Sequence, residues 1–395
     1  MKIGVTGIGV VSGIGLNVDE NIESLRLRRH GLDKPQFFQT TLDLPVSEVK
    51  RSNAQLAQML QLPPNSTYSR TALLGMLAAK EALTDSQINP KQIRVGLVSS
   101  TSVGGMDLSE IFYTDFKDDH HKGRLRLIKQ HDCGASTELI ANYIGVSGFV
   151  TTISTACSSA GNAIMLGARM LKNNMLDAVV VGGTDALCKF TLNGFNSLMI
   201  LDKEPCRPFD NSRAGLNLGE GAGFLVLQDV SKAKRQPYCL LTGYANANDA
   251  FHQTGCSPNG EGAFLSMSKA LSMANLTSAD VDYINVHGTG TPNNDLSESI
   301  AIKRLFGKNV PEFSSVKAFV GHTLGASEGI EAAYSVLSVS KGFVYPNLNF
   351  KNAIAETNLV PVTEFAVKTQ VRNVLSNAFG FGGNDTSLVF SSINN

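Results

Sequence analysis

The sequence predicts an α/β protein built from two similar halves, each with a sheet buried between helices. Its candidate strands, including 95–99, 178–181 and 281–286, are short and apolar without strict alternation. This pattern is typical of sheets that helices cover on both faces. The chain opens with an apolar run that reaches Thr-Gly at 6–7, and a second run at 239–244 carries Thr-Gly again. The two runs indicate an internal duplication.

In the first half, a buried strand leads through small residues into a helix. The apolar segment 151–155 precedes Cys157, and an apolar helical run covers 158–171. The change from a continuous apolar run to a helical period predicts a strand, a turn and a helix in that order. Cys157 would then lie at the start of the helix.

The second half repeats this arrangement. Buried strand segments at 313–316 and 319–320 precede His322, and a helical run covers 324–339. We therefore expect reactive residues at matching helix starts in the two halves. The polar stretch 231–237 is the predicted seam between them.

With this seam, the sequence divides into a half over 1–230 that carries the cysteine and a half over 231–395 that carries both candidate histidines. Nothing of low complexity separates them. We expect one duplicated core rather than two or three independent domains.

The composition excludes several classes of protein. Hydrophobic residues make up 43 % of the 395 and charged residues 17 %, which is too apolar for a disordered chain. The 34 basic and 34 acidic side chains cancel, so no overall basic field attracts nucleic acid. No run approaches ~18 apolar residues, and we expect no membrane span. Six cysteines without a C-x-x-C pair favour a cytoplasmic protein.

Glycine is in excess, with 37 residues where average usage of about 7 % gives roughly 28. The excess indicates tight turns or close backbone approaches. The first cluster, over 7–13, suggests a dinucleotide-binding turn, but Ser12 stands where G-x-G-x-x-G needs its third glycine. We interpret this cluster as a tight turn after the first strand.

Cys157 lies in the segment T155-A-C-S-S-A160. A helix N-terminus offers unpaired N–H groups and a positive dipole end, so this position is expected to lower the pKa of the thiol. A buried, inert cysteine is an equally good interpretation of the segment alone.

Two histidines favour the reactive interpretation. His287 lies in V286-H-G-T-G-T-P292, where an apolar strand ends. His322 follows a turn and precedes a helix, so nearby N–H groups are expected to keep its ring neutral. A neutral imidazole can donate a hydrogen bond to an oxygen that develops negative charge. With Cys157 they form a nucleophile and two candidate stabilising groups.

Five ordered segments resemble the beta-ketoacyl-acyl-carrier-protein synthases, and most of all their elongating Cys-His-His branch. They are T155-A-C-S-S-A160, R207-P-F-D210 with G219-E-G-A-G223, V286-H-G-T-G-T-P292, K317 to E331, and N377-A-F-G-F-G-G383. The resemblance covers essentially the whole chain. It implies the thiolase fold, in which two duplicated halves form five alternating α-β-α-β-α layers.

The resemblance also implies roles for individual residues. Cys157 matches the acyl-accepting nucleophile, and His287 and His322 match the pair that promotes malonyl decarboxylation and stabilises the enolate. Lys317 and Glu331 match supporting charges, and Thr289 and Thr291 match threonines that bind the pantetheine arm. Phe381 matches a gating aromatic residue, whose N–H joins that of Cys157 in the oxyanion hole. Val103 matches a residue at the floor of the acyl pocket.

The implied reaction is a decarboxylative Claisen condensation. The acyl group on Cys157 joins malonyl-acyl-carrier protein and gives beta-ketoacyl-acyl-carrier protein and CO2, in fatty acid or polyketide and polyene elongation. No metal or other cofactor is expected, because the carrier protein brings its own phosphopantetheine. The implied partners are the acyl carrier protein and a second subunit, in a homodimer or a heterodimer.

The acidic carrier needs a local basic surface on this neutral chain. The segment 122–129 is basic and is the predicted docking surface, through Lys122, Arg124, Arg126 and Lys129. A solvated face remains the alternative for each of them. His120, His121, His131 and Cys133 have no standard zinc spacing, and we predict no metal site there.

The chain also departs from the family pattern. After Gly383 the family has Thr-Asn, whereas Asn384 and Asp385 follow here, which predicts a negative charge beside the gating turn. No cysteine follows Cys256, so the second catalytic cysteine of a thiolase is missing. A silent partner subunit of a heterodimer is the remaining alternative, and the presence of Cys157 argues against it.

Overall fold

The computed structural model describes residues 1–63 and 66–393 and places ten strands in one mixed sheet. These are β1 (Ile3–Ser12), β4 (Val95–Ser100), β5 (Val150–Ile153), β6 (Ala178–Asp185), β7 (Gly221–Asp229), β8 (Cys239–Asn248), β9 (Tyr283–Asn285), β10 (Glu312–Ser314), β13 (Asn373–Gly380) and β14 (Asn384–Ser391). Short two-stranded pairs are formed by β2 (Leu32–Asp33) with β3 (Val46–Ser47) and by β11 (Phe343–Val344) with β12 (Ala366–Val367).

The strand order shows the duplication directly. One half of the sheet runs β5-β4-β6-β7-β1 and the other β10-β9-β13-β14-β8. In both halves the first two pairings are parallel and the next two antiparallel. The halves meet where Gly4 pairs with Leu240 and Val5 with Cys239. The predicted α/β fold with two duplicated halves is confirmed, whereas the boundary between 230 and 231 stays a prediction.

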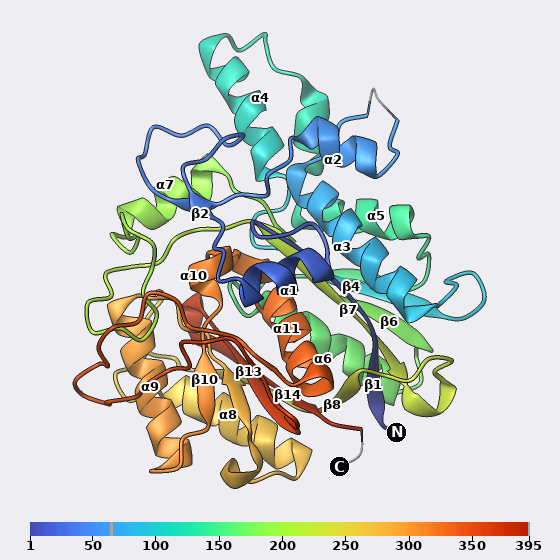
Figure 1. Ribbon diagram of the computed structural model, residues 1–395. Coiled ribbons are helices and arrows are strands. Elements are labelled where there is room, and N and C mark those ends of the chain that lie inside the picture. Colours follow the sequence, from blue (N-terminus) through green and yellow to red (C-terminus); the bar gives the residue numbers. More distant parts are fainter. Residues whose placement is uncertain (64–65, 394–395) are drawn as a thin grey trace.

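The helices form the remaining layers (Figure 1). They are α1 (Val18–Arg26), α2 (Asn53–Met59), α3 (Arg70–Ser86), α4 (Met106–Asp118), α5 (Cys133–Ile144), α6 (Ser159–Lys172), α7 (Lys189–Ser197), α8 (Glu261–Ala274), α9 (Pro292–Phe306), α10 (Lys317–Val320) and α11 (Ser327–Lys341). Helices α6 and α11 lie between the two halves of the sheet, α3 and α5 cover one outer face, and α8 and α9 the other. No helix in the described ranges is both long and apolar enough to cross a membrane.

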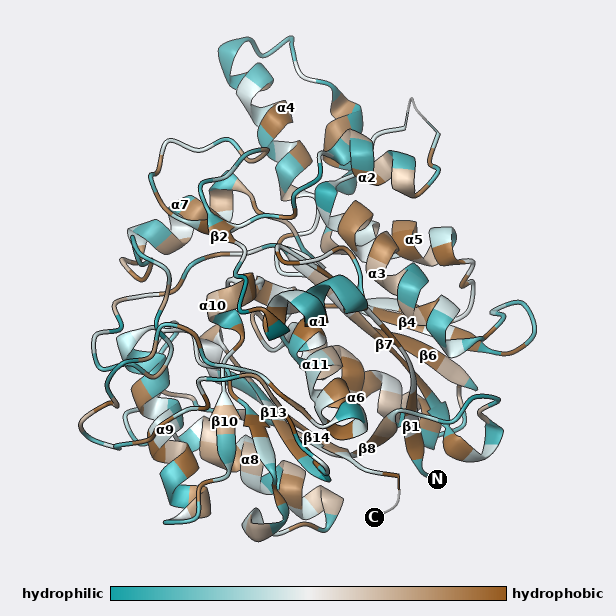
Figure 2. Ribbon diagram, in the orientation of Figure 1, coloured by the Kyte–Doolittle hydropathy of each residue, from teal (hydrophilic) through white to brown (hydrophobic). Residues whose placement is uncertain are grey.

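Burial explains why the two central helices carry so few charges. Every residue of α11 from Ser327 to Ser338 is buried, and apolar side chains from α6, α11 and both halves of the sheet form one core. Figure 2 shows apolar residues on these strands and central helices, and a mixture of polar and apolar residues on α4. The ends of α6 and α11 that follow Cys157 and His322 are therefore held rigidly.

Two sequence predictions need correction here. The first strand does not end near Gly7 but continues to Ser12, because residues 7–12 pair with β7. Its glycines allow α3 to pack closely, since a Cβ on Gly9 would lie 2.0 Å from the carbonyl oxygen of Ala78. The segment 319–320 is not a strand, since it lies in α10. That short helix places Lys317 and His322 at its two ends.

Candidate active site

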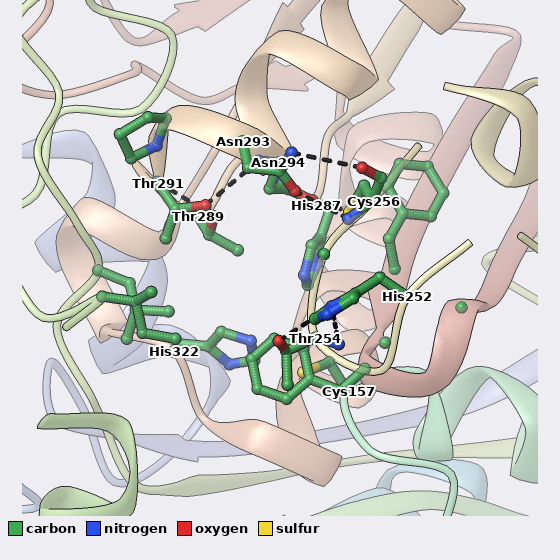
Figure 3. Close-up of a pocket in the computed structure, with 18 of the residues that line it drawn as sticks. Cys157, His252, Thr254, Cys256, His287, Thr289, Thr291, Asn293, Asn294 and His322 are labelled. Atoms are coloured by element: carbon green, nitrogen blue, oxygen red, sulfur yellow. Dashed lines mark hydrogen bonds between the residues drawn. The ribbon is translucent and has the colours of Figure 1, made fainter. Parts of the chain in front are cut away.

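Three chemically reactive side chains meet at one cavity, as the sequence predicted. One ligating atom from each of Cys157, His287 and His322 lies within 4.8 Å of the others. Cys157 precedes α6, His287 follows β9, and His322 lies between α10 and α11. Figure 3 shows both imidazoles directed toward the cysteine. The two halves of the chain thus contribute to a single site.

The backbone around Cys157 forms a tight turn. Ala156 has φ of +54°, a conformation that costs a non-glycine residue energy and is common at functional sites. Helix α6 begins at Ser159, so the thiol lies beside its N-terminus.

The expected lowering of the thiol pKa is wrong for the resting protein. Burial raises the pKa of Cys157 to about 12, although Lys317 and the backbone N–H groups of Phe381 and Cys157 act in the opposite direction. The desolvation of a thiolate outweighs the helix end and the nearby ammonium here. The raised pKa therefore favours the neutral thiol form of Cys157 in the resting protein.

The ring of His322 is held as a hydrogen-bond donor toward the cavity. The backbone N–H of Leu324 donates to its Nδ1 over 3.0 Å, so the neutral ring carries its proton on Nε2. Burial and the charge of Lys317 hold the pKa of His322 well below its usual value. This agrees with the neutral ring expected from the sequence.

His287 is fixed in the same tautomer by different groups. The Lys317 ammonium lies 3.3 Å from its Nδ1 and donates to its carbonyl oxygen over 2.6 Å. Burial, Lys317 and His322 hold the pKa of His287 well below its usual value. The two imidazole planes are nearly perpendicular, with centroids 5.4 Å apart. Both rings thus present an Nε2–H group.

Lys317 and Glu331 form a buried ion pair behind the histidines. The distance from Nζ to Oε1 is 2.5 Å, and both side chains are almost fully buried. Burial raises the pKa of Glu331 and Lys317 opposes that rise. On the other side, Glu298 accepts the backbone N–H groups of His287 and Gly288 over 2.9 and 2.8 Å. His287 is thereby fixed at both its ring and its backbone.

The cavity in front of these groups measures about 290 Å³. Thr289 and Thr291 line it, with their hydroxyl oxygens 2.9 Å apart. Phe381 also lines it and stacks on Phe195 of α7, with ring centroids 5.6 Å apart. The turn after Phe381 consists of Gly382 and Gly383 at positive φ. The gating role expected for Phe381 stays a prediction.

Asp385 is not a negative charge beside the gate at neutral pH, contrary to the sequence prediction. Only 5 % of its surface is exposed. Burial and the neighbouring carboxyl groups of Asp249 and Glu298 raise its pKa to about 8. It lines the cavity, where its raised pKa favours the protonated form at neutral pH.

Other predicted residues lie outside this cluster. Val103 does not line the cavity within the described residues, and its backbone N–H donates to buried Asp185. The predicted docking residues Lys122, Arg124, Arg126 and Lys129 are all exposed. His120, His121, His131 and Cys133 do not gather as a metal cluster in the described ranges. Docking at the basic segment stays a prediction.

The structure adds residues that the sequence analysis did not identify. Phe195 of α7, Phe379 of β13 and His252 of the loop after β8 line the cavity. Glu298 supports His287 from α9. Aromatic residues in helices are ordinarily core residues, so no local signal marked Phe195. Glu298 follows the V286-H-G-T-G-T-P292 motif by six residues, and only the turn of α9 brings it back.

Comparisons with known proteins agree with this geometry. Residues 1–233 match the beta-ketoacyl synthase N-terminal domain and residues 238–351 its C-terminal domain. A 3-oxoacyl-[acyl-carrier-protein] synthase 2 from Staphylococcus aureus is 30 % identical over 408 residues, which cover 99 % of this chain and 98 % of that protein.

Two solved structures are similar along the whole chain. The ishigamide ketosynthase/chain length factor has a TM-score of 0.93 at 27 % identity and covers 99 % of both chains. A ketosynthase (ApeO) in complex with its chain length factor (ApeC) from Xenorhabdus doucetiae has a TM-score of 0.84 at 29 % identity, covering 99 % of this chain and 98 % of that one. With the Cys-His-His cluster in place, the chain belongs to the beta-ketoacyl synthase family and has its thiolase fold.

Proposed function

We propose that this chain elongates acyl groups through a Cys157 acyl-enzyme, with His287 and His322 promoting malonyl decarboxylation and condensation. The observation that carries the proposal is the meeting of one thiol and two imidazoles, within 4.8 Å, at the wall of a cavity. A nucleophile beside two neutral donors suits a reaction that forms first a thioester and then an enolate.

In the first half-reaction, the Cys157 sulfur attacks the carbonyl carbon of the acyl thioester. A new C–S bond forms, the bond to the carrier sulfur breaks, and the proton of Cys157 goes to the departing carrier thiol. The two histidines act here as donors rather than bases, because each Nδ1 faces a donor and each Nε2 carries hydrogen. The Nε2–H groups stabilise thiolate character as the attack begins.

The oxyanion of this step needs its own donors. The backbone N–H groups of Cys157 and Phe381 both face the Cys157 sulfur. An acyl carbonyl bonded to that sulfur would place its oxygen near both N–H groups. Two such donors at a developing oxyanion are a large contribution to rate, about 10²–10³-fold for one of them.

In the second half-reaction, malonyl thioester loses CO2 and leaves an enolate. The two Nε2–H groups donate to the enolate oxygen, whose negative charge would otherwise be costly in a buried site. The enolate carbon then attacks the carbonyl carbon of the Cys157 thioester, and the C–S bond to Cys157 breaks. The released sulfur takes up a proton from solvent, and the beta-ketoacyl thioester leaves on the carrier. No free cofactor takes part, because the phosphopantetheine arrives with the substrate.

An acyl carrier protein is the proposed partner. Thr289 and Thr291 line the cavity, and their hydroxyl groups are placed to hydrogen-bond to a pantetheine amide. Exposed Lys122, Arg124 and Arg126 in the predicted docking segment supply a local positive surface. The proposed carrier-dependent reaction belongs in the cytoplasm, where the six free cysteines also stay reduced.

A second subunit is the other proposed partner. Large apolar side chains of α4 and of α7 and the residues after it are exposed: Ile111 by 54 %, Tyr113 and Phe190 by 62 % and Met199 by 88 %. An apolar surface of this kind is ordinarily covered by another subunit. Both solved structures described above are named for a ketosynthase with a chain length factor, which favours a heterodimer, with a homodimer as the alternative.

The comparisons do not identify which acyl group the enzyme elongates. The curated relative is named for 3-oxoacyl synthesis and the similar structures for ketosynthase and chain length factor pairs. The test offers saturated and polyenoyl carrier thioesters of several lengths with malonyl carrier and follows the product by mass spectrometry. Condensation of saturated donors supports fatty acid elongation, and condensation confined to polyenoyl donors supports the polyketide and polyene role. Acylation without condensation of any donor contradicts the proposal, and the absence of an acyl adduct with every donor supports the silent partner.

A further inference from the structure

Glu328 is a buried acid that the reaction above does not use. It lies on α11, three residues before Glu331, and none of its surface is exposed. Its Oε1 atom has no hydrogen-bond partner in the described part of the chain. A buried carboxyl group costs several kcal/mol if it is ionised and unpaired, so its presence beside the active site requires a reason.

The carboxyl group of Glu328 contacts the helix that carries the nucleophile. The backbone N–H of Gly161, in the first turn of α6, faces the carboxyl group. A Cβ on Gly161 would lie 1.8 Å from Oε2 of Glu328 and 2.7 Å from Oγ1 of Thr386. Glu328 therefore fills the space that a side chain at 161 would occupy.

Glu328 also contacts the strand pair that carries Phe381. Its Oε2 lies 2.5 Å from Oγ1 of Thr386 on β14. The same hydroxyl lies 3.1 Å from the carbonyl oxygen of Ala378 on β13. Because a hydroxyl has one hydrogen and a carbonyl oxygen can only accept, we assign the hydrogen of the shorter contact to Glu328. Glu328 is then a protonated acid.

The charges around Glu328 also favour its protonated form. Those that act on it are Glu331, on its own helix, and Lys317 of α10. Lys317 is already paired with Glu331 at 2.5 Å, so little positive charge remains for a second carboxylate. Burial raises the pKa of Glu328 well above its usual value.

The two contacted elements hold the two halves of the predicted oxyanion hole. The N–H of Cys157 precedes α6, and the N–H of Phe381 lies in the turn that joins β13 to β14. Asn384, at the start of β14, makes a second link: its Oδ1 accepts from Ser158 over 2.9 Å and from Asn162 over 3.0 Å. Helix α6 is thus tied to β14 at two points, one of them through Glu328.

We propose that Glu328, as a protonated acid, is a positioning residue that fixes the first turn of α6 against β14 and thereby sets the distance between the N–H groups of Cys157 and Phe381. This inference rests on the proposed function, because only an acyl-enzyme needs both N–H groups at one oxygen. It gives a role to a buried glutamate of α11 that, unlike Glu331, has no ion-pair partner in the described part of the chain.

The experiment compares Glu328→Gln, which keeps the shape and a donor, with Glu328→Leu, which keeps only the volume. Acylation of Cys157 by an acyl carrier thioester is followed by intact-protein mass spectrometry. We expect Glu328→Gln to acylate within threefold of the unaltered enzyme and Glu328→Leu at least tenfold more slowly, with KM for the donor unchanged. An infrared carbonyl band of a buried protonated acid should be present in the resting enzyme and lost in Glu328→Gln.

Two variants of Thr386 test the same contact if Glu328→Leu does not fold. Thr386→Ser retains the hydroxyl and should acylate like the unaltered enzyme, whereas Thr386→Val should be slow like Glu328→Leu. Circular dichroism and thermal unfolding check that each variant is folded. Wild-type rates in both Glu328→Leu and Thr386→Val would overturn the inference.

Three further outcomes separate this inference from the proposed function. If Glu328→Gln is as slow as Glu328→Leu and the infrared band is absent, Glu328 acts as a carboxylate and the inference is wrong. If the unaltered enzyme is acylated by no donor, the proposed function fails and the inference fails with it. If acylation is normal and the band is absent, the inference alone fails.

Discussion

The ammonium nitrogen of Lys317 lies 3.3 Å from Nδ1 of His287. This contact keeps a positive charge against a ring that must remain neutral, and it fixes the proton of that ring on Nε2. His322 reaches the same state through a backbone N–H instead. Two different contacts therefore have the same effect, and both neutral rings present an N–H donor to Cys157.

Removing the ammonium should damage condensation more than acylation. In Lys317→Met, His287 loses the partner of its Nδ1, and Glu331 loses its counter-ion. We expect condensation to fall by about 10²-fold or more, in the range of a lost acid–base or electrostatic group. Rates of Cys157 acylation and of malonyl decarboxylation, measured separately, check this. Equal losses in both half-reactions would contradict the assignment.

His322→Ala should accept an acyl group and condense poorly. Loss of one of two donors to the enolate oxygen should slow condensation by about 10²–10³-fold, while the nucleophile remains. Product formation by mass spectrometry, after pre-acylation of Cys157, measures this step alone. The exposed His131→Ala is the control and should condense normally; a normal rate in His322→Ala would show that its ring is not a donor in this step.

Asp385 should make stability depend on pH in a recognisable way. Its pKa is raised to about 8 in the folded protein and is about 3.9 in an unfolded chain. Between these values the folded state holds the extra proton, so the free energy of unfolding falls by about 1.4 kcal/mol per pH unit as pH rises. Asp385→Asn lacks this contribution.

The measurement is urea unfolding of both proteins at pH 5, 6.5 and 8, and the relevant quantity is their difference. Buried carboxyl groups that do not interact with Asp385, such as Glu81 with a pKa raised to about 7, are common to both proteins and cancel. The unaltered protein should lose stability relative to Asp385→Asn across this range. A constant difference would show that the folded pKa of Asp385 is not raised.

The buried ion pair between Arg70 and Glu220 lies outside the catalytic cavity and should contribute to the stability of the fold. Arg70 contacts both carboxylate oxygens of Glu220, at 2.6 to 2.9 Å, and Glu220 also accepts the N–H groups of Val49 and Leu187. Arg70→Met leaves that carboxylate unpaired and should cost about 3–5 kcal/mol in the free energy of unfolding.

The exposed pair of Arg94 and Asp177 provides the control for this prediction. The Arg94 side chain is 52 % exposed, and Arg94→Met should change the free energy of unfolding by about 1 kcal/mol or less. Thermal and urea unfolding compare the two variants. Similar small losses would mean that the Arg70 pair is not an essential part of the core.

The sequence predicted the residues of the site better than their electrostatics. Cys157, His287 and His322 lie on motifs at strand and helix ends, where local patterns are informative, and the structure brings them together. The pKa of Cys157 was predicted in the wrong direction, because its dominant cause is burial by distant segments. Asp385 was misjudged for the same reason, since burial, together with the carboxyl groups of Asp249 and Glu298, raises its pKa.

Residues that act through long-range packing were not predictable. Glu328 has an unremarkable place in a helical run, and only the folded chain shows it against Gly161 and Thr386. The strand order of the sheet likewise depends on pairings between β1 and β8, about 235 residues apart. Local patterns identified the duplication, but not how the halves join.

The most direct test of the central claim is the site of acylation. Purified protein is incubated with acyl carrier thioesters of several lengths, and peptide mass spectrometry locates the acyl group, with Cys157→Ala as control and Cys256, in the same cavity, as the competing thiol. The account predicts one acyl group on Cys157, none in Cys157→Ala, and condensed product after malonyl carrier is added. Acylation of Cys256, or of no residue with any donor, would contradict it.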